Sequence, residues 1–257
     1  MTSAAALGRL RRLLRLRRRE IIAIRVLAVL TAIAALGLAS AWALAAGEPA
    51  WWAAAAPANP AAQTDAATRL ENAFASEASK PRAPDPDAPA SSLPWAVLIR
   101  TDDLAAWLSA KLPKWLAGRD GTPARPDDAA VRLIETRVLC QPGVLTLGAR
   151  VRAAGVDRVL WVRCTPVIRD DALWLSAADV SIGRLPAPAS WVLDAADARG
   201  SPDGNSRPAL ADALVGRGPL LASPSLRLHD HRRVRLLDIR IEPEGVVLTC
   251  ATEAPAR

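Results

Sequence analysis

The chain has 257 residues, enough for one sizeable domain with accessory segments, and a formal net charge of +7. The first 25 residues contain eight arginines and one acid, whereas the remaining residues balance at 25 basic and 25 acidic side chains. Because the basic excess is confined to one end, the bulk of the chain lacks the charge of a nucleic-acid-binding surface, and we expect no nucleic-acid partner.

Residues 21–46 form a long apolar run, and no charged side chain occurs from 26 to 46. About 20 apolar residues at 1.5 Å each cross a hydrocarbon core of about 30 Å. We therefore predict a transmembrane helix at 21–46. Trp42, Trp51 and Trp52 follow near its far end, where indoles favour the membrane interface.

The arginine-rich residues 1–20 are expected to form a cytoplasmic tail, because positive flanks remain inside. This orientation predicts a single-pass protein of the cytoplasmic (inner) membrane of a bacterial cell envelope, with its C-terminal domain outside the cytoplasm. A cleaved signal peptide is the alternative, since Ala43-Leu44-Ala45 fits a small-x-small cleavage site. The long basic region and long apolar run favour an uncleaved anchor.

Residues 47–92 are rich in alanine and proline and predict a stalk, which a helix at about 64–79 interrupts. The folded domain is expected to occupy residues 93–257. Within it, the hydrophobic pattern predicts a strand at 94–100 and a helix at 101–112 that Pro113 ends or kinks.

Four strands then follow, separated by short turns, and two short helices precede a closing hairpin. The strands are expected at 131–140, 144–153, 158–168 and 172–183, the helices at 183–199 and 209–217, and the hairpin at 233–241 and 246–252. The short connections favour antiparallel pairing. The predicted fold class is α+β, with a curved antiparallel sheet packed by two or three helices, and alternation along 144–153 predicts one face exposed to water.

The tryptophans raise two alternatives. Trp107 belongs to an apolar stripe on helix 101–112 that would contact the sheet, and Trp191 suits a buried position on the helix expected at 183–199. Core packing explains both residues. The alternative is an apolar groove for a lipid or a partner, lined by Trp107, Trp115 and Trp191.

The three cysteines, Cys140, Cys164 and Cys250, all lie in or at the end of predicted strands. An extracytoplasmic location permits a disulfide, and Cys140–Cys164 and Cys164–Cys250 are the candidate pairs. Because three is an odd number, at least one thiol stays free or pairs between chains. Buried reduced thiols are the alternative.

Catalytic and metal-binding patterns are sparse. His229 and His231 are the only histidines, and a zinc site would need further ligands. The sequence has no GxSxG elbow, phosphate-binding loop, GxGxxG or CxxC motif. We therefore expect no catalytic residues, metal ligands or cofactor, and the alternative is an envelope hydrolase whose site is unidentified.

Three segments, residues 101–113, 180–188 and 234–248, carry a resemblance that covers roughly residues 95–252. In their order, the chain resembles YpmS-like and planctomycete membrane-anchored extracytoplasmic proteins of unknown function. It departs from them at Ala105, where asparagine is frequent, and at Ala187, where leucine is common. The resemblance implies a single N-terminal anchor and, by fold-level analogy, lipid binding.

These patterns together predict a membrane-anchored protein with a non-enzymatic binding or scaffold domain. Its expected partners are the membrane, through residues 21–46, and a lipid or an envelope protein.

Overall fold

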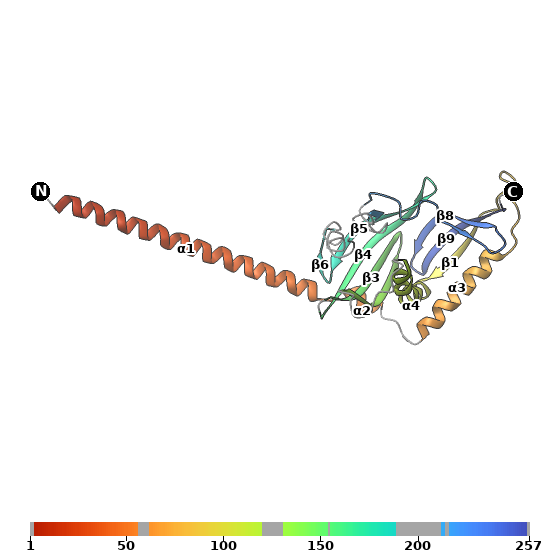
Figure 1. Ribbon diagram of the computed structural model, residues 1–257, viewed down its shortest axis with the longest axis horizontal. Coiled ribbons are helices and arrows are strands. Elements are labelled where there is room, and N and C mark those ends of the chain that lie inside the picture. Colours follow the sequence, from red (N-terminus) through yellow and green to blue (C-terminus); the bar gives the residue numbers. More distant parts are fainter. Residues whose placement is uncertain are drawn as a thin grey trace. The chain divides into compact units, whose positions relative to one another are not determined.

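A computed structural model describes residues 3–55, 62–119, 131–153, 155–188, 212–213 and 216–255 (Figure 1). The helices are α1 (Ser3–Ala46), α2 (Ala50–Ala54), α3 (Gln63–Ser79) and α4 (Thr101–Arg119). The strands are β1 (Trp95–Arg100), β2 (Val131–Gln141), β3 (Val144–Ala153), β4 (Val156–Arg169), β5 (Ala172–Ile182), β6 (Leu185–Pro186), β7 (Ser225–Arg227), β8 (Arg233–Glu242) and β9 (Gly245–Glu253).

The chain divides into two compact units, Met1–Ala45 and Ala46–Arg257. The first unit contains α1, a continuous helix of 44 residues; from Val26 on, its large apolar side chains are exposed, as at Leu36 and Leu38. Within the described residues, this is the one helix long and apolar enough to cross a membrane. A membrane span and a signal sequence both have these properties.

The second unit is an α+β domain that contains two antiparallel sheets. One sheet has five strands in the order β2-β3-β4-β5-β6, a meander in which each strand pairs with the next along the chain. Short turns dictate this topology: Pro142 and Gly143 connect β2 to β3, and Gly143 has a φ of 74° that glycine adopts without strain.

The other sheet has the order β1-β9-β8-β7 and joins the start of the domain to its end. Trp95 pairs with Cys250, and Arg100 pairs with Gly245. A Cβ at Gly245 would lie 2.1 Å from the Ile99 carbonyl oxygen, so the close approach of β1 requires glycine there. The backbone N–H of Gly143 donates to the Ile241 carbonyl, which connects the two sheets.

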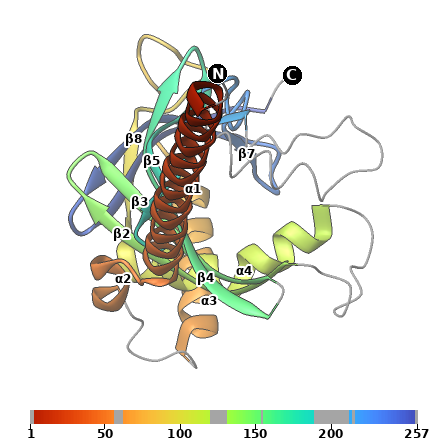
Figure 2. The same ribbon diagram turned by 90° about the vertical axis from the view of Figure 1, so that its left-hand side faces the viewer.

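Helices α3 and α4 lie beside one another and pack against the sheets (Figure 1 and Figure 2). Leu104, Ala105 and Leu108 of α4 join a core with Val138 and Cys140 of β2. That core also includes residues of the other sheet, Ile241 and Val246. A second cluster packs Ala78 of α3 on Trp95, Val234 and Cys250.

The structure confirms the α+β class and the antiparallel strands, but it differs from the prediction of a single curved sheet, because β1 pairs with β9 in a separate sheet. Of the two effects predicted for Pro113, an end or a kink of the helix, the end was wrong, since α4 continues to Arg119. A proline removes its own N–H bond and crowds the carbonyl four residues earlier, but the residues beyond it keep their N–H groups and can continue the helix. The helix expected at 183–199 falls largely outside the described residues, and β6 occupies its start.

Candidate functional site

The segment directly after α1 is docked on the five-stranded sheet. Residues 48–52, which we call the clasp segment, include Pro49, which is buried, and Trp52, which is 0% exposed. The expectation that Trp52 lies at the membrane interface was therefore wrong. The stalk predicted to begin at residue 47 is, over these residues, part of the folded domain.

Gly148, in the middle of β3, makes room for the clasp segment. A Cβ at this position would lie 2.6 Å from Cη2 of Trp51 and 2.8 Å from Cζ3 of Trp52. Real Cβ atoms do not approach other atoms this closely, so both indoles depend on the absence of a side chain at this position. The clasp segment thus covers the polar face of β3, which the alternating pattern had predicted to be exposed to water.

Trp51 packs edge-on against two other indoles. Its ring centroid lies 5.6 Å from that of Trp52 and 6.2 Å from that of Trp161, the residue that pairs with Gly148 across β3 and β4. The Trp161 indole N–H donates to the Gly183 carbonyl at 2.7 Å. Edge-to-face aromatic pairs contribute roughly 0.5–1.5 kcal/mol beyond area burial.

Two arginines of the sheet lie against the Trp52 ring. The guanidinium carbon of Arg137 is 4.4 Å from the ring centroid, and that of Arg150 is 5.5 Å away. Arg137 also donates a hydrogen bond to the Trp52 carbonyl oxygen. Cation–π contacts are stronger when the ring is desolvated, as it is here.

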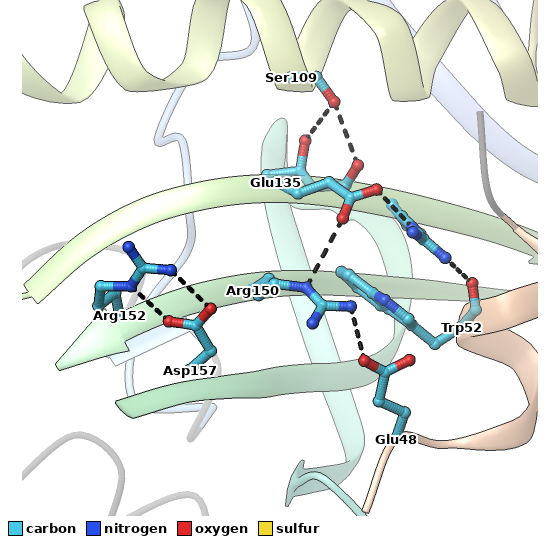
Figure 3. A network of polar contacts seen from close by, with 9 residues as sticks. Glu48, Trp52, Ser109, Glu135, Arg150, Arg152 and Asp157 are labelled. Atoms are coloured by element: carbon cyan, nitrogen blue, oxygen red, sulfur yellow. Dashed lines mark hydrogen bonds and ion pairs between the residues drawn. The ribbon is translucent and has the colours of Figure 1, made fainter. Parts of the chain in front are cut away.

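Carboxylates complete the network that Figure 3 shows. Glu48 accepts a hydrogen bond from Nη2 of Arg150 at 2.7 Å, and its carbonyl accepts one from Nε of Arg184 at 2.8 Å. Glu135 lies 2.7 Å from Nε of Arg137 and 3.7 Å from Nε of Arg150. The exposed Glu48 carboxylate adds little energy, so burial of the indoles dominates the docking.

The two docked indole N–H groups are buried and have no hydrogen-bond partner among the described residues. Docking therefore depends on packing, on the arginine contacts and on the backbone bonds from Arg137 and Arg184. Contacts of these kinds are typical of a structural attachment between two segments of a chain. Farther along the same strands, Arg152 forms two hydrogen bonds with Asp157, at 2.6 and 2.9 Å, which lower the pKa of that carboxyl.

Of the three tryptophans proposed for an apolar groove, only the side chain of Trp107 is described, so their grouping stays a prediction. Trp107 contacts α3, where its indole N–H donates to Oε1 of Glu71 at 3.0 Å. The side of α4 that faces the sheets instead carries Leu104, Ala105 and Leu108. The side chain of Trp115 and all of Trp191 lie outside the described residues.

The three cysteines are free and buried. Cys140 and Cys164 both pair with Leu145, from opposite sides of β3, so two strand spacings, or roughly 9.5 Å, separate them. A disulfide requires Cα atoms within about 7 Å, so this pair cannot form one in the observed register. Cys250 lies in the other sheet, opposite Trp95.

The histidine segment forms an exposed turn before β8. Asp230 accepts hydrogen bonds from the backbone N–H and Nε of Arg232, at 3.1 and 2.6 Å, and these bonds lower its pKa. His231 has a φ of 67° and its Nδ1 lies 3.4 Å from Arg227. The described residues contain no group of three or more His, Cys, Asp or Glu side chains placed to hold a metal ion.

No protein-family model, curated protein or solved structure matches this chain. The resemblance of residues 95–252 to the YpmS-like proteins therefore remains a prediction.

One signal in the sequence points to the clasp segment. Gly148 interrupts an otherwise regular alternation along β3, and an isolated glycine inside a strand often marks the close approach of another part of the chain. Nothing in the sequence identifies the partner, because the docked tryptophans lie nearly 100 residues earlier. Sequence reasoning assigned them to the membrane interface because they follow an apolar helix.

Proposed function

We propose that this protein is a single-pass protein of the cytoplasmic membrane. Residues 1–20 form its cytoplasmic tail, and its α+β domain is a non-enzymatic binding or scaffold module outside the cytoplasm. The length and exposed apolar surface of α1 support the anchor. The eight arginines among the first 25 residues support the orientation, because positive charge is retained on the cytoplasmic side.

The clasp segment is the observation that carries the scaffold proposal. Only Gly47 separates Ala46, the last residue of α1, from Glu48. Glu48 is held by Arg150 of β3 and by Arg184 of the turn between β5 and β6. The domain is thus attached to its anchor through residues that belong to its own core. An attachment point built into the domain's own core suits a module that stays at the membrane and presents a surface to a partner there.

A protein partner is favoured over a lipid. The lipid alternative predicted an apolar groove between helix 101–112 and the sheet. In the described residues, this interface is filled by Leu104 and Leu108 against Val138, Cys140 and Ile241. A hollow of about 330 Å³ exists elsewhere, where the two sheets meet, and Gly143, Pro166 and Ile239 contribute to its lining.

The test combines topology with crosslinking in intact membranes. Protease added outside spheroplasts should degrade the domain, and the mature protein should retain the mass of the full chain. Photo-crosslinking residues placed at exposed positions of the domain, such as Leu98 and Leu226, should capture one defined protein.

Three outcomes would each contradict one element of the proposal: the anchor, the orientation or the protein partner. A mature N-terminus after Ala45 would remove the anchor, and protection of the domain in spheroplasts would reverse the orientation. Stoichiometric lipid extracted from the purified protein, without a protein crosslink, would replace the protein partner with a lipid.

A further inference from the structure

The N-terminal half of α1 extends well beyond what a membrane span requires. The whole helix has 44 residues, or about 66 Å at 1.5 Å per residue, whereas a hydrocarbon core measures about 30 Å. The uncharged residues 26–46 suffice for the span. The helical residues before them, 3–25, form an additional segment of about 35 Å.

We propose that this additional segment is a basic amphipathic helix that binds anionic phospholipid headgroups on the cytoplasmic side of the membrane. The inference rests on the proposed membrane span and orientation, and it adds a ligand class and a binding face. The arginines then have a role beyond setting topology.

The helical spacing of the arginines supports a single binding face. At 100° per residue, five of them fall within a sector of about 120°. These five are Arg11, Arg12, Arg15, Arg18 and Arg19, and Ile22 is an apolar residue that interrupts their sector.

Apolar residues occupy much of the opposite sector, from roughly 220° to 340°. They are Leu7, Leu10, Leu13, Leu14, Ile21 and Ile24, and Arg17 and Arg25 interrupt this sector. A helix with arginines on one face and leucines on the other is the type that lies in the membrane interface, with its apolar face between the headgroups. On the membrane, the segment therefore turns away from the axis of the span near residue 25 instead of continuing straight from it.

Charge identifies the lipid class. The segment carries eight arginines and a single acid, Glu20, while the rest of the chain is balanced. A guanidinium group donates paired hydrogen bonds to phosphate oxygens, which an anionic headgroup presents without a neutralising cation. Each arginine near an anionic surface strengthens binding by about fivefold, and the five on the shared face act together.

The experiment uses the full chain in lipid nanodiscs, which leave both membrane faces accessible, so that a change of orientation does not affect the result. A cysteine introduced by Leu14→Cys, in the apolar sector, carries a fluorophore sensitive to polarity. The native thiols are buried, and the labelled chain without the added cysteine measures their background. Discs contain phosphatidylcholine alone or phosphatidylcholine with about one-third phosphatidylglycerol.

We expect the label to report a less polar environment in the anionic discs than in the neutral discs, and the difference to disappear in about 0.5 M NaCl, which screens headgroup charge. Changing the five clustered arginines to glutamine should abolish the difference, a loss of up to about three-thousandfold in binding. Changing the same five to lysine should preserve most of it, because the charge is kept.

Equal label environments in the two kinds of disc would overturn the inference, as would a glutamine variant that behaves like the natural chain. Either result leaves the membrane span intact if the chain co-elutes with the discs. Failure of the natural chain to co-elute with any disc would instead overturn the proposed membrane protein, and this inference with it.

Discussion

Truncating Trp52 to alanine tests whether the clasp segment belongs to the cooperative fold of the domain. The side chain is completely buried, and a buried tryptophan covers about 200 Å². At about 25 cal/mol per Å², its burial contributes about 5 kcal/mol, an upper bound because the unfolded chain also buries some surface. We therefore expect Trp52→Ala to lower the free energy of unfolding by about 3–5 kcal/mol.

The assay is equilibrium unfolding in urea of the full chain in detergent micelles, followed by tryptophan fluorescence. The expected loss corresponds to a shift in the midpoint of roughly 1–2 M urea. Trp42→Ala is the matched control, because Trp42 is 63% exposed and lies on α1, outside the domain. If the two variants shift the midpoint equally, the clasp segment contributes nothing to the domain and the reasoning is refuted.

Gly148 provides a second, sharper test through a double-mutant cycle. In the natural chain, Gly148→Ala places a Cβ against Trp51 and Trp52 and should cost about 1–3 kcal/mol. In a chain that also carries Trp51→Ala and Trp52→Ala, the same change should be neutral or stabilising, because alanine loses less backbone entropy than glycine. Additive effects would show that the contact is absent in solution.

Two further predictions concern the buried thiols and the contact between the helices. Burial raises the pKa of Cys164 and Cys250 from 9.0 to about 11, so the fold favours the neutral thiols. Their stabilisation is fully present below about pH 9 and is lost as the pH rises towards 11, by about 3 kcal/mol for each thiol. Urea unfolding between pH 7 and 11 measures this loss. The chain has no tyrosine and few lysines, the other side chains that would titrate in this range. In a Cys164→Ala/Cys250→Ala variant, the free energy of unfolding should change less with pH. Trp107→Phe removes the hydrogen bond to Glu71, so amide hydrogen exchange in α3 should accelerate. The free energy of unfolding of the domain should fall by less than about 1 kcal/mol. Unchanged exchange would show that this bond does not hold α3.

The strands of the domain could be predicted from sequence because their information is local. The expected hairpin at 131–140 and 144–153 corresponds to β2 and β3, and the closing hairpin corresponds to β8 and β9. Proline and glycine mark the turns between them, and alternation marks the faces. The pairing of β1 with β9 has no such signal, because short turns specify only neighbouring strands, and so one sheet was expected where two exist.

The clasp segment could not be predicted for the same reason. Trp51 and Trp52 are followed by alanines and have no periodic pattern, so their local context matches a membrane interface as well as a core. Only the strands that carry Arg137, Gly148 and Trp161 distinguish the two, and those strands lie far along the chain.

The two ends of the domain also determine when the protein can finish folding. Glu48 can form its hydrogen bond with Arg184 only after another 136 residues have been synthesised, and Trp95 can pair with Cys250 only after the last strand has been made. At 5–20 residues per second, synthesis of those 136 residues takes roughly 7–27 s. Throughout that interval Trp51 and Trp52 have no strand to pack against, so the newborn chain exposes two adjacent indoles that the finished domain buries in part or completely.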